Sequence, residues 1–374
     1  MSFGKRIKAL RRNKDMTQEQ LAEILSVSPQ AVSRWETDSA MPDISLIPAI
    51  CNLFDTSADH LLGIDNENKE KRIEEIYNNA HAYSSRGYHR EARVILEEGI
   101  REFPNSFLLL KSLMQLSHRQ FNTNDGYTAD ELKAFQDEAI SLGERILESC
   151  TDDSIRHSAI QILCFMYPKA GNRERAIELA ESMPYMSVSR EFLMPRIYIG
   201  NKQYSAIQEK IFDLLQWFVH SVDNMYIKDD SGKLIYTADE NAILRDKLIV
   251  ILNTVFEDGD FGYFHTILAS IHKGQAHFYA KTKDKVKVLN HLKAASDHAI
   301  GFIDSFKDGK GHHTSLLFRS YGFGSFSTSD RNNDAMRLIN EMKKTEYDFI
   351  RDTAQFVEIE ERMSKYAQKW EIDS

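Results

Sequence analysis

The chain has 374 residues, of which 42% are hydrophobic and 28% charged, and its formal net charge is −9. That length exceeds one small domain, and three cysteines without a CxxC pair exclude a disulfide scaffold and indicate reduced thiols. No apolar run is long enough to span a membrane, and residues 1–14 are too basic and broken for a signal peptide. We therefore expect a cytoplasmic protein of two domains without membrane contact.

Two short helices are predicted in the stretches MTQEQLAEIL and SPQAVSRWE. Thr17 and Ser28 are suited to cap them, because their hydroxyls can accept from free backbone N–H groups. Gln20 completes a capping box after Thr17, and Pro29 stands at the first helical position, where its missing N–H is harmless. So few residues separate the two helices that they must cross steeply, which is typical of a helix-turn-helix.

The second of these helices has two different faces. Val32 and Trp35 recur at helical spacing and predict its buried side. The opposite side carries the polar residues Gln30, Ser33, Arg34 and Thr37. Arginine can donate two hydrogen bonds to guanine in the major groove of DNA, and glutamine can pair with adenine. The alternative for such residues is an ordinary solvated helix face.

The stretch that runs from RIKALRRNKDMTQEQ to SADHLLG, across residues 3–63, resembles the phage-repressor or Cro-type (XRE) family. The resemblance implies a five-helix, lambda-repressor-like domain that binds double-stranded DNA. It also implies that Thr17 and Gln18 touch phosphate and that Arg11 and Glu36 form an ion pair between the first and third helices. Ser28, Pro29, Gln30, Ser33, Arg34 and Thr37 complete the expected DNA contacts of the two helices.

Two residues depart from the family pattern. Ser26 stands where the family usually has a turn glycine, and Asp38 stands near a usual helix-ending glycine. A positive φ at a residue other than glycine costs about 1 kcal/mol, although aspartate tolerates it better than most. We expect altered turn energetics within the same fold. Pro48 further indicates that the fourth helix begins near Ser45, because proline is tolerated in a first turn.

Basic charge is concentrated near the amino terminus. The first 64 residues hold seven Lys/Arg and eight Asp/Glu, and six of these basic residues lie in KRIKALRRNK. Phosphate contact depends on local charge, so Lys5, Lys8 and Arg12 are candidates for it. A solvated face is the alternative, and Arg11 is expected to be occupied by Glu36.

The remainder predicts a second domain. Residues 65–72, DNENKEKR, have no apolar side chain and indicate a solvated linker between residues 1–64 and 73–374. Beyond it the helical period dominates, with longer helices around 128–149, 205–226 and 239–256. A tetratricopeptide-like spacing occurs at Ala80, Tyr83, Ala92, Leu96 and Pro104, with weaker echoes at Cys164, Tyr167, Ala176 and Ala180 and at Ala276, Tyr279, Leu292 and Ala295. The expected fold class is all-α, with an irregular α-solenoid after the DNA-binding domain.

Other motifs predict little chemistry. His265 and His272 share a helix face, but no carboxylate or cysteine set accompanies them, so we expect neither a metal site nor a cofactor. No catalytic constellation is visible, and we expect no enzyme. Asn253 interrupts the apolar run LIVILNTVF and could bond the backbone of an effector peptide; the alternative is that neighbouring helices satisfy it.

Three functions remain open. The leading hypothesis is a one-component transcription regulator whose helical domain senses a peptide, a protein or a small molecule. The second is an interaction scaffold tethered to DNA, and the third, a DNA-bound enzyme, lacks supporting residues. One short helix covers few base pairs, so we expect a homodimer on a near-palindromic operator. Residues 1–64 carry −1 and the rest −8, so the acidic helical domain is the expected dimer contact.

Overall fold

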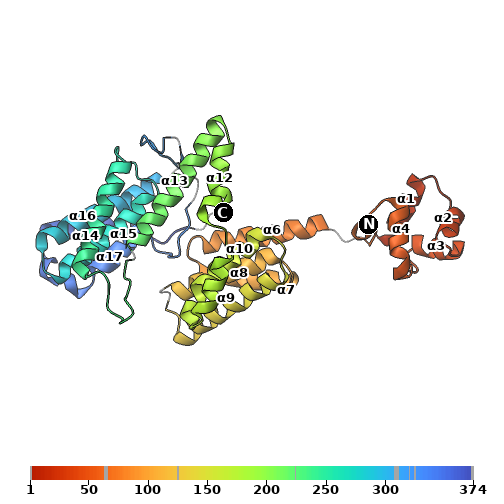
Figure 1. Ribbon diagram of the computed structural model, residues 1–374, viewed down its shortest axis with the longest axis horizontal. Helices are drawn as coiled ribbons and strands as arrows, with labels where there is room; N and C mark the ends of the chain where they lie inside the picture. The colour runs from red at the N-terminus through yellow and green to blue at the C-terminus, as the bar shows by residue number, and fades with distance from the viewer. Residues whose placement is uncertain are drawn as a thin grey trace. The chain divides into compact units, whose positions relative to one another are not determined.

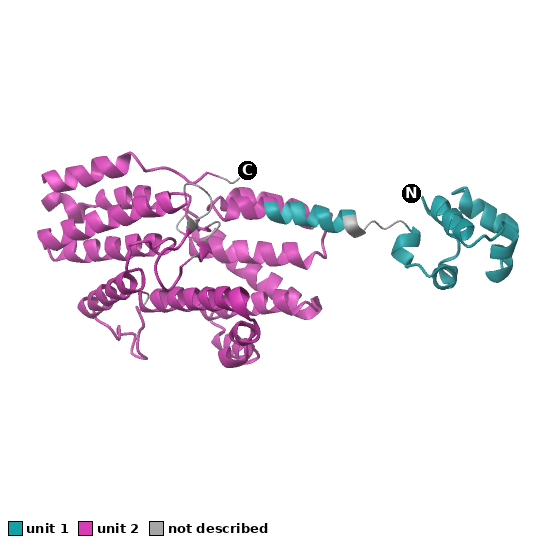
Figure 2. Cartoon of the chain, turned by 90° about the horizontal axis from the view of Figure 1, so that it is seen from above, with its two compact units in different colours: residues 1–78 teal, residues 79–374 magenta. Residues whose placement is uncertain are grey.

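The computed structural model describes residues 2–62, 66–123, 126–223, 225–306, 311–319, 321–323 and 326–371. The chain forms two compact units, residues 1–78 and 79–374, which are coloured separately in Figure 2. The elements of the amino-terminal unit are α1 (Phe3–Asn13), α2 (Gln18–Ile24), α3 (Pro29–Glu36), the 3-10 helix η1 (Ile44–Leu46), α4 (Ile47–Phe54) and α5 (Ala58–Leu62). Figure 1 labels α1 to α4. α6 (Asn66–Ser84) crosses the division between the units.

Each of the five helices in the amino-terminal unit contributes to one core. Ile7, Leu21, Val32, Ile50 and Leu61, one from each helix, all have 0% exposure. α1 packs against α3 and α5, while α2 packs against α3. α4 begins at Ile47, directly after the 3-10 turn η1 that contains Ser45, so Pro48 falls in its first turn. This is the five-helix arrangement that the sequence predicts.

The expected linker is helical. Residues 66–72 form the first turns of α6, and residue 65 lies outside the described residues. Glutamate, lysine and arginine are good helix formers, and no glycine or proline interrupts them. An ion pair between Arg72 and Glu75 at 3.4 Å adds weak support. Residues 68–72 are exposed, so the solvated character that the sequence predicts belongs to a helix rather than to a loop.

The carboxy-terminal unit is built from helices that pack mainly on their neighbours in sequence. Its first part comprises α7 (His89–Glu102), α8 (Phe107–Asn122), α9 (Ala129–Ser149), α10 (Asp153–Met166), η2 (Pro168–Ala170) and α11 (Arg173–Glu181). Its second part comprises η3 (Met186–Val188), α12 (Arg190–Ile197), α13 (Gly200–Asp223), α14 (Ala238–Val255), α15 (Phe264–Lys281), α16 (Lys285–Ser305), α17 (Asp334–Met342), η4 (Thr345–Ile350) and α18 (Ala354–Ser364).

The weaker repeat echoes both fall on packed helix pairs. Cys164 of α10 faces the Ala176 carbonyl of α11, with its Sγ 3.4 Å away. Ala276 of α15 and Leu292 of α16 are fully buried where these two helices pack. The small side chains permit close approach of the helices. A two-residue antiparallel ladder between β1 (Gly311–His312) and β2 (Gly322–Phe323), which the pattern did not predict, is inserted before α17.

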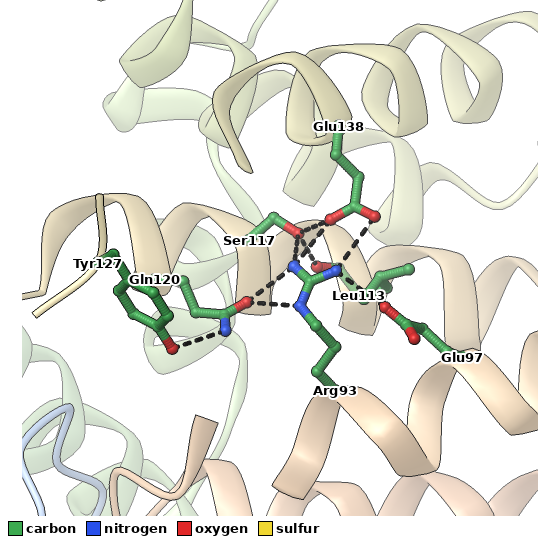
Figure 3. A network of polar contacts seen from close by, with 7 residues as sticks. All are labelled: Arg93, Glu97, Leu113, Ser117, Gln120, Tyr127 and Glu138. Carbon is green, nitrogen blue, oxygen red and sulfur yellow. Dashed lines mark hydrogen bonds and ion pairs between the residues drawn. The ribbon is translucent and has the colours of Figure 1, made fainter. Parts of the chain in front are cut away.

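A polar network centred on Arg93 joins α7, α8 and α9 (Figure 3). Its guanidinium donates to Glu138 at 2.8 Å, to Gln120 at 2.7 Å and to Ser117 at 3.0 Å. Ser117 in turn donates to Glu138 at 2.5 Å. Because the Arg93 side chain is only 17% exposed, these charge-assisted bonds are shielded from water and fix the three helices in register.

Four histidines line the contact between α15 and α16. Nδ1 of His265 lies 2.9 Å from Nδ1 of His298, and Nδ1 of His272 lies 2.9 Å from Nδ1 of His291. A neutral imidazole has one donor and one acceptor nitrogen, so each pair can share one hydrogen bond as long as at least one of its two rings is neutral. Burial, together with the neighbouring histidines, lowers the pKa of both His265 and His272 to about 3.

Gly301 makes room for this row of rings. A Cβ at that position would lie 2.4 Å from Cε1 of His265. Among the residues that the structure describes, no group of three or more His, Cys, Asp or Glu is placed to hold a metal ion. The described helices also include none with both the length and the apolar character that crossing a bilayer requires.

The two ends of the carboxy-terminal unit are joined. The turn after α6 pairs with the segment before α17: Thr328 N–H donates to Ser85 O at 2.8 Å, and the Arg86 guanidinium donates to Phe326 O. Gly87 has a φ of +79°, and a Cβ there would lie 2.6 Å from the backbone nitrogen of Arg331. Glycine is therefore required twice at this position, for its conformation and for its size.

Candidate nucleic-acid interface

Both helix starts have the caps that the sequence predicts. The Thr17 hydroxyl accepts from Gln20 N–H at 3.2 Å, and the Gln20 side chain accepts from Thr17 N–H at 2.8 Å. The Ser28 hydroxyl accepts from Ala31 N–H at 3.2 Å, with Pro29 at the first helical position. These caps define where α2 and α3 begin, and therefore which residues of α3 face outward.

α3 has a sharply divided surface. Val32, Trp35 and Glu36 are buried. Pro29, Gln30, Arg34 and Thr37 are exposed, and Ser33 is half-buried. The Arg34 side chain makes one long contact, from Nε to the Gln30 carbonyl at 3.4 Å. The Thr37 hydroxyl donates to the Ser33 carbonyl at 3.0 Å, so this hydroxyl satisfies the end of the helix and can only accept from DNA.

A buried ion pair holds α3 to α1. Arg11 Nε lies 2.5 Å from Glu36 Oε1, and Arg11 Nη2 lies 3.0 Å from Glu36 Oε2. Burial alone would raise the pKa of Glu36, but hydrogen bonds from Arg11 and Gln18 outweigh it and lower that pKa. Glu36 therefore stays ionised, and the bidentate geometry fixes the rotation of α3 about its axis.

Gln18 has a contact that the sequence interpretation did not include. Its amide donates to Glu36 Oε2 at 2.9 Å, which extends the ion pair from α1 and α3 to α2. The expected contact of Gln18 with phosphate stays a prediction, since the amide retains a second N–H. Sequence spacing could not reveal this bond. Gln18 becomes half-buried and Glu36 buried only when the three helices pack together.

The basic residues of α1 divide into two groups. Arg6 donates to His60 O at 2.8 Å, and Lys14 donates to Leu53 O at 2.6 Å, so these two side chains hold the carbonyls of α5 and α4. Lys5, Lys8 and Arg12 recur at helical spacing, and Lys5 and Arg12 are exposed while Lys8 is half-buried. The three candidates for phosphate contact are thus the ones that share a face of α1.

Asp38 has a structural role that the sequence interpretation missed. It adopts a φ of +57°, and Ser26 adopts a φ of +56°. The Asp38 carboxylate accepts from Gly4 N–H at 2.7 Å and from the Ser2 hydroxyl at 2.5 Å, so it caps α1 from the end of α3. Gly4 permits this approach, because a Cβ there would lie 2.4 Å from Trp35 O. Local spacing gives no signal for a cap supplied from a distant residue.

Asn253 bonds its own helix. Its side chain is exposed on α14, and its amide donates at 2.8 Å to Ile249 O in the same helix. Neighbouring helices do not supply this bond, and the expected contact of Asn253 with an effector peptide stays a prediction. A polar side chain within an apolar run can bond its own helix when it points to solvent.

Comparison with known proteins agrees with this geometry. A family model described as Helix-turn-helix matches residues 7–61. The chain is 35% identical over 85 residues to the HTH-type transcriptional activator BcrR of Enterococcus faecalis. This match covers 21% of this chain and 41% of that protein. The chain is also 35% identical over 74 residues to the HTH-type transcriptional regulator ImmR of Bacillus subtilis, covering 20% and 58% respectively. The chain thus spans about half the length of these relatives.

Solved structures give a weaker likeness over more of the chain. PlcR of Bacillus thuringiensis, in complex with the peptide PapR7 and DNA, has 13% identity and a TM-score of 0.31 over 82% of this chain and 95% of its own. ComR of Streptococcus vestibularis in its apo form has a TM-score of 0.24. These scores are too low to support a functional argument. The match over residues 7–61 and the capped, divided α3 identify the amino-terminal unit as an XRE-type helix-turn-helix domain.

Proposed function

We propose that this chain is a sequence-specific DNA-binding transcription regulator. The observation that carries the proposal is the outward face of α3, where Gln30 and Arg34 are exposed while Val32 and Trp35 of the same helix are buried. An arginine and a glutamine on one short exposed helix are the side chains that read guanine and adenine in the major groove. Thr17, Gln18, Lys5, Lys8 and Arg12 supply the proposed phosphate contacts. This role places the chain with the nucleoid in the cytoplasm.

The experiment that tests base reading compares cognate and scrambled duplexes. The cognate site is first obtained by selecting bound sequences from a random pool with the full chain. Arg34→Ala and Gln30→Ala should each weaken cognate binding by about 1–3 kcal/mol and leave binding to the scrambled duplex nearly unchanged. Glu23→Ala, an exposed substitution on α2, serves as the control for general effects. Equal losses on both duplexes would exclude base reading by these residues.

We propose further that the regulator acts as a homodimer through its carboxy-terminal unit. Large apolar side chains are exposed on η3, α12 and α13 and directly next to them in sequence, and these three elements pack on one another in chain order. They include Tyr185, Met186, Val188, Ile197, Ile199 and Trp217, with 84%, 61%, 58%, 67%, 86% and 69% exposure. Exposed apolar groups in such number mark interaction surfaces. A second copy is the occupant that a two-fold, near-palindromic operator requires.

Sedimentation of the full chain tests the dimer. The wild-type chain should sediment as a dimer at micromolar concentration, and Ile199→Asp combined with Trp217→Asp should give a monomer that binds the operator at least tenfold more weakly. Val286→Asp is the matched control, because its side chain is 68% exposed and lies on α16, away from those three elements in sequence. A wild-type chain that sediments as a monomer would contradict the proposal.

Effector sensing is the remaining part of the proposal. The carboxy-terminal unit makes up most of the chain, and its role would be to bind a peptide, a protein or a small molecule and thereby change operator affinity. The scaffold alternative predicts an operator affinity that no effector changes. Operator titrations with and without extracts fractionated by size separate these two functions.

A further inference from the structure

The carboxy-terminal unit contains a cavity of about 410 Å³ that is partly open to solvent. Side chains of α13, α15, α16 and α17 line it, together with residues 326–330 and Trp370. This volume is in the range of sites that hold small organic ligands. The cavity is therefore large enough for a ligand, and its lining determines which chemistry would fit.

Two buried polar atoms on this lining have no hydrogen-bond partner among the described residues, namely Asp334 Oδ2 and Trp370 Nε1. Asp334 is 7% exposed, and its other carboxylate oxygen accepts from Arg337 Nη1 at 3.0 Å. Leaving a buried carboxylate oxygen unpaired is costly, because the group has lost its water. A cation within the cavity would supply the missing partner.

The carboxylates around the cavity share nearby cations. Arg337 is shared between Asp334 and Asp330, each with an oxygen 3.0 Å from it. Asp223 also lines the cavity but is paired with Arg245 at 2.7 Å. Burial raises the pKa of Asp334, although Arg337, Thr266 and Lys273 act in the opposite direction. Because Arg337 and Lys273 offset the charges of Asp334 and Asp330, what remains for a ligand is Asp334 Oδ2, which can accept from a ligand N–H.

Aromatic rings form another part of the wall. The Phe326 ring lies 4.7 Å from that of Trp370 and 5.0 Å from that of Phe302, and Tyr263 lies 6.4 Å from Phe302. Aromatic faces attract cations and also accommodate apolar groups. The hydroxyls of Thr266 and Ser270 complete a lining that can receive the N–H groups of an ammonium ion.

We infer that this cavity binds an organic primary ammonium ion, with Asp334 as its counter-ion and the aromatic cluster against its apolar part. The inference deepens the proposed function, because it assigns the effector class of the regulator. The same chemistry can come from a free small amine or from the amino terminus of a short peptide. Both sources present a primary ammonium beside an apolar group.

Residues of the cavity wall also contact the end of α6, the helix that follows the DNA-binding domain in sequence. Phe326 and Thr328 belong to its wall, and the backbone of this segment bonds Ser85 and Arg86 directly after α6. The Arg86 guanidinium further stacks on the Phe326 ring, 4.2 Å from its centre. A ligand that repositions Phe326 therefore acts on the end of α6, which is how occupancy would reach the amino-terminal part of the chain.

Calorimetric titration of the full chain without DNA tests the site. The probes are 2-phenylethylamine, protonated at neutral pH, and its neutral and anionic counterparts 2-phenylethanol and phenylacetate. We expect the amine to bind at least tenfold more tightly than either counterpart. Equal binding of amine and alcohol, or no heat from the amine at millimolar concentration, would overturn the inference. A tetrapeptide Phe-Ala-Ala-Ala with a free or an acetylated amino terminus then distinguishes the two sources.

Three variants assign the residues. Asp334→Asn should lower amine affinity at least tenfold, whereas Asp348→Asn, an exposed acid paired with Arg351 on η4, should leave it unchanged. Ser270→Phe narrows the cavity from an exposed rim position and should also abolish binding, so the inference stays testable if Asp334→Asn fails to fold. Unchanged affinity in folded Asp334→Asn or in Ser270→Phe would contradict the assignment. Since no DNA is present, failure here is separable from failure of operator binding.

Discussion

The two units treat buried polar groups differently. Among residues 2–62, the buried charged side chains are Arg11 and Glu36, and each bonds the other in bidentate geometry. In the carboxy-terminal unit, Asp334 Oδ2 and Trp370 Nε1 are buried without a partner in the described residues, and each of two histidine pairs can keep its hydrogen bond only while at least one of its rings is neutral. A unit whose polar groups are all satisfied is suited to present a fixed surface. One with unsatisfied groups is suited to respond to a ligand or to protons.

The largest expected effect on stability concerns the ion pair between Arg11 and Glu36. Arg11→Ala or Glu36→Ala leaves one buried charge without its partner, so either should lower the free energy of unfolding of the amino-terminal unit by about 3–5 kcal/mol. Hydrogen exchange of the full chain, followed by mass spectrometry, reports this through peptides from residues 2–62. Peptides beyond residue 78 provide the internal reference, and Arg12→Ala is the exposed control. Unchanged protection in both variants would show that the pair does not stabilise the unit.

Arg93 tests whether the carboxy-terminal unit also depends on a satisfied network. Arg93→Ala removes the bonds to Ser117, Gln120 and Glu138 and should lower the free energy of unfolding by about 2–3 kcal/mol, less than for Arg11 because Glu138 is 32% exposed. Urea unfolding can be followed by tryptophan fluorescence in a Trp35→Phe background, which leaves the signal to Trp217 and Trp370. Lys133→Ala, which breaks an exposed pair with Asp137, should cost less than about 1 kcal/mol.

Acid should lower the stability of the carboxy-terminal unit more than that of the amino-terminal unit. The pKa values of His265 and His272 are lowered to about 3 in the folded chain, whereas unfolded histidine titrates near 6.5. The unfolded chain therefore binds more protons below pH 6.5, and the stability present above that pH is lost as the pH falls towards 3. At pH 5 the loss is about 2 kcal/mol for each histidine.

The same urea experiment at pH 7 and pH 5 measures this loss in the carboxy-terminal unit, and hydrogen exchange of peptides from residues 2–62 at the same two pH values measures the amino-terminal unit. Burial lowers the pKa of His298 to about 4, so this residue adds to the effect. The amino-terminal unit should be unaffected over this range, because Glu36 has a lowered pKa and loses its stabilising effect only below the unfolded glutamate value near 4.3. Equal acid sensitivity of the two units would contradict the lowered pKa values of the buried histidines.

The smallest expected effect compares two residues with the same backbone conformation. Ser26 and Asp38 both have positive φ, but only Asp38 caps α1 through Gly4 N–H. Ser26→Gly should raise the free energy of unfolding by about 1 kcal/mol. In Asp38→Gly the same gain is offset by a lost cap worth about 1 kcal/mol. Thermal melts that rank the two variants equally would indicate that the Asp38 contact contributes nothing.

The amino-terminal unit could be predicted because its information is local. The caps at Thr17 and Ser28, the inward spacing of Val32 and Trp35, and the place of Pro48 all follow from residues within one turn of each other. The family resemblance implied the contact between Arg11 and Glu36. Sequence spacing could not predict the bonds of Gln18 to Glu36 and of Asp38 to Gly4, because these bonds depend on how the helices pack.

The carboxy-terminal unit could be predicted only as a helical array. Apolar periodicity indicated the helices around 128–149 and 239–256, which are observed as α9 and α14. The Arg93 network, the histidine pairs and the cavity join residues that are far apart in sequence, and their side chains look like ordinary polar helix positions. The helical start of α6 was missed because a segment without apolar residues fits a loop and a solvated helix equally well.

The junction between the turn after α6 and the segment before α17 has a consequence for how the chain folds. Arg86 and Phe326 are 240 residues apart in sequence, and the bond of Tyr88 to Trp370 joins residues 282 apart. An open repeat array can fold from any point and fray at its ends, whereas contacts of such long sequence separation form late and slow folding. During synthesis, the turn after α6 leaves the ribosome long before its partner exists, so the carboxy-terminal unit can reach its native state only when the chain is nearly complete.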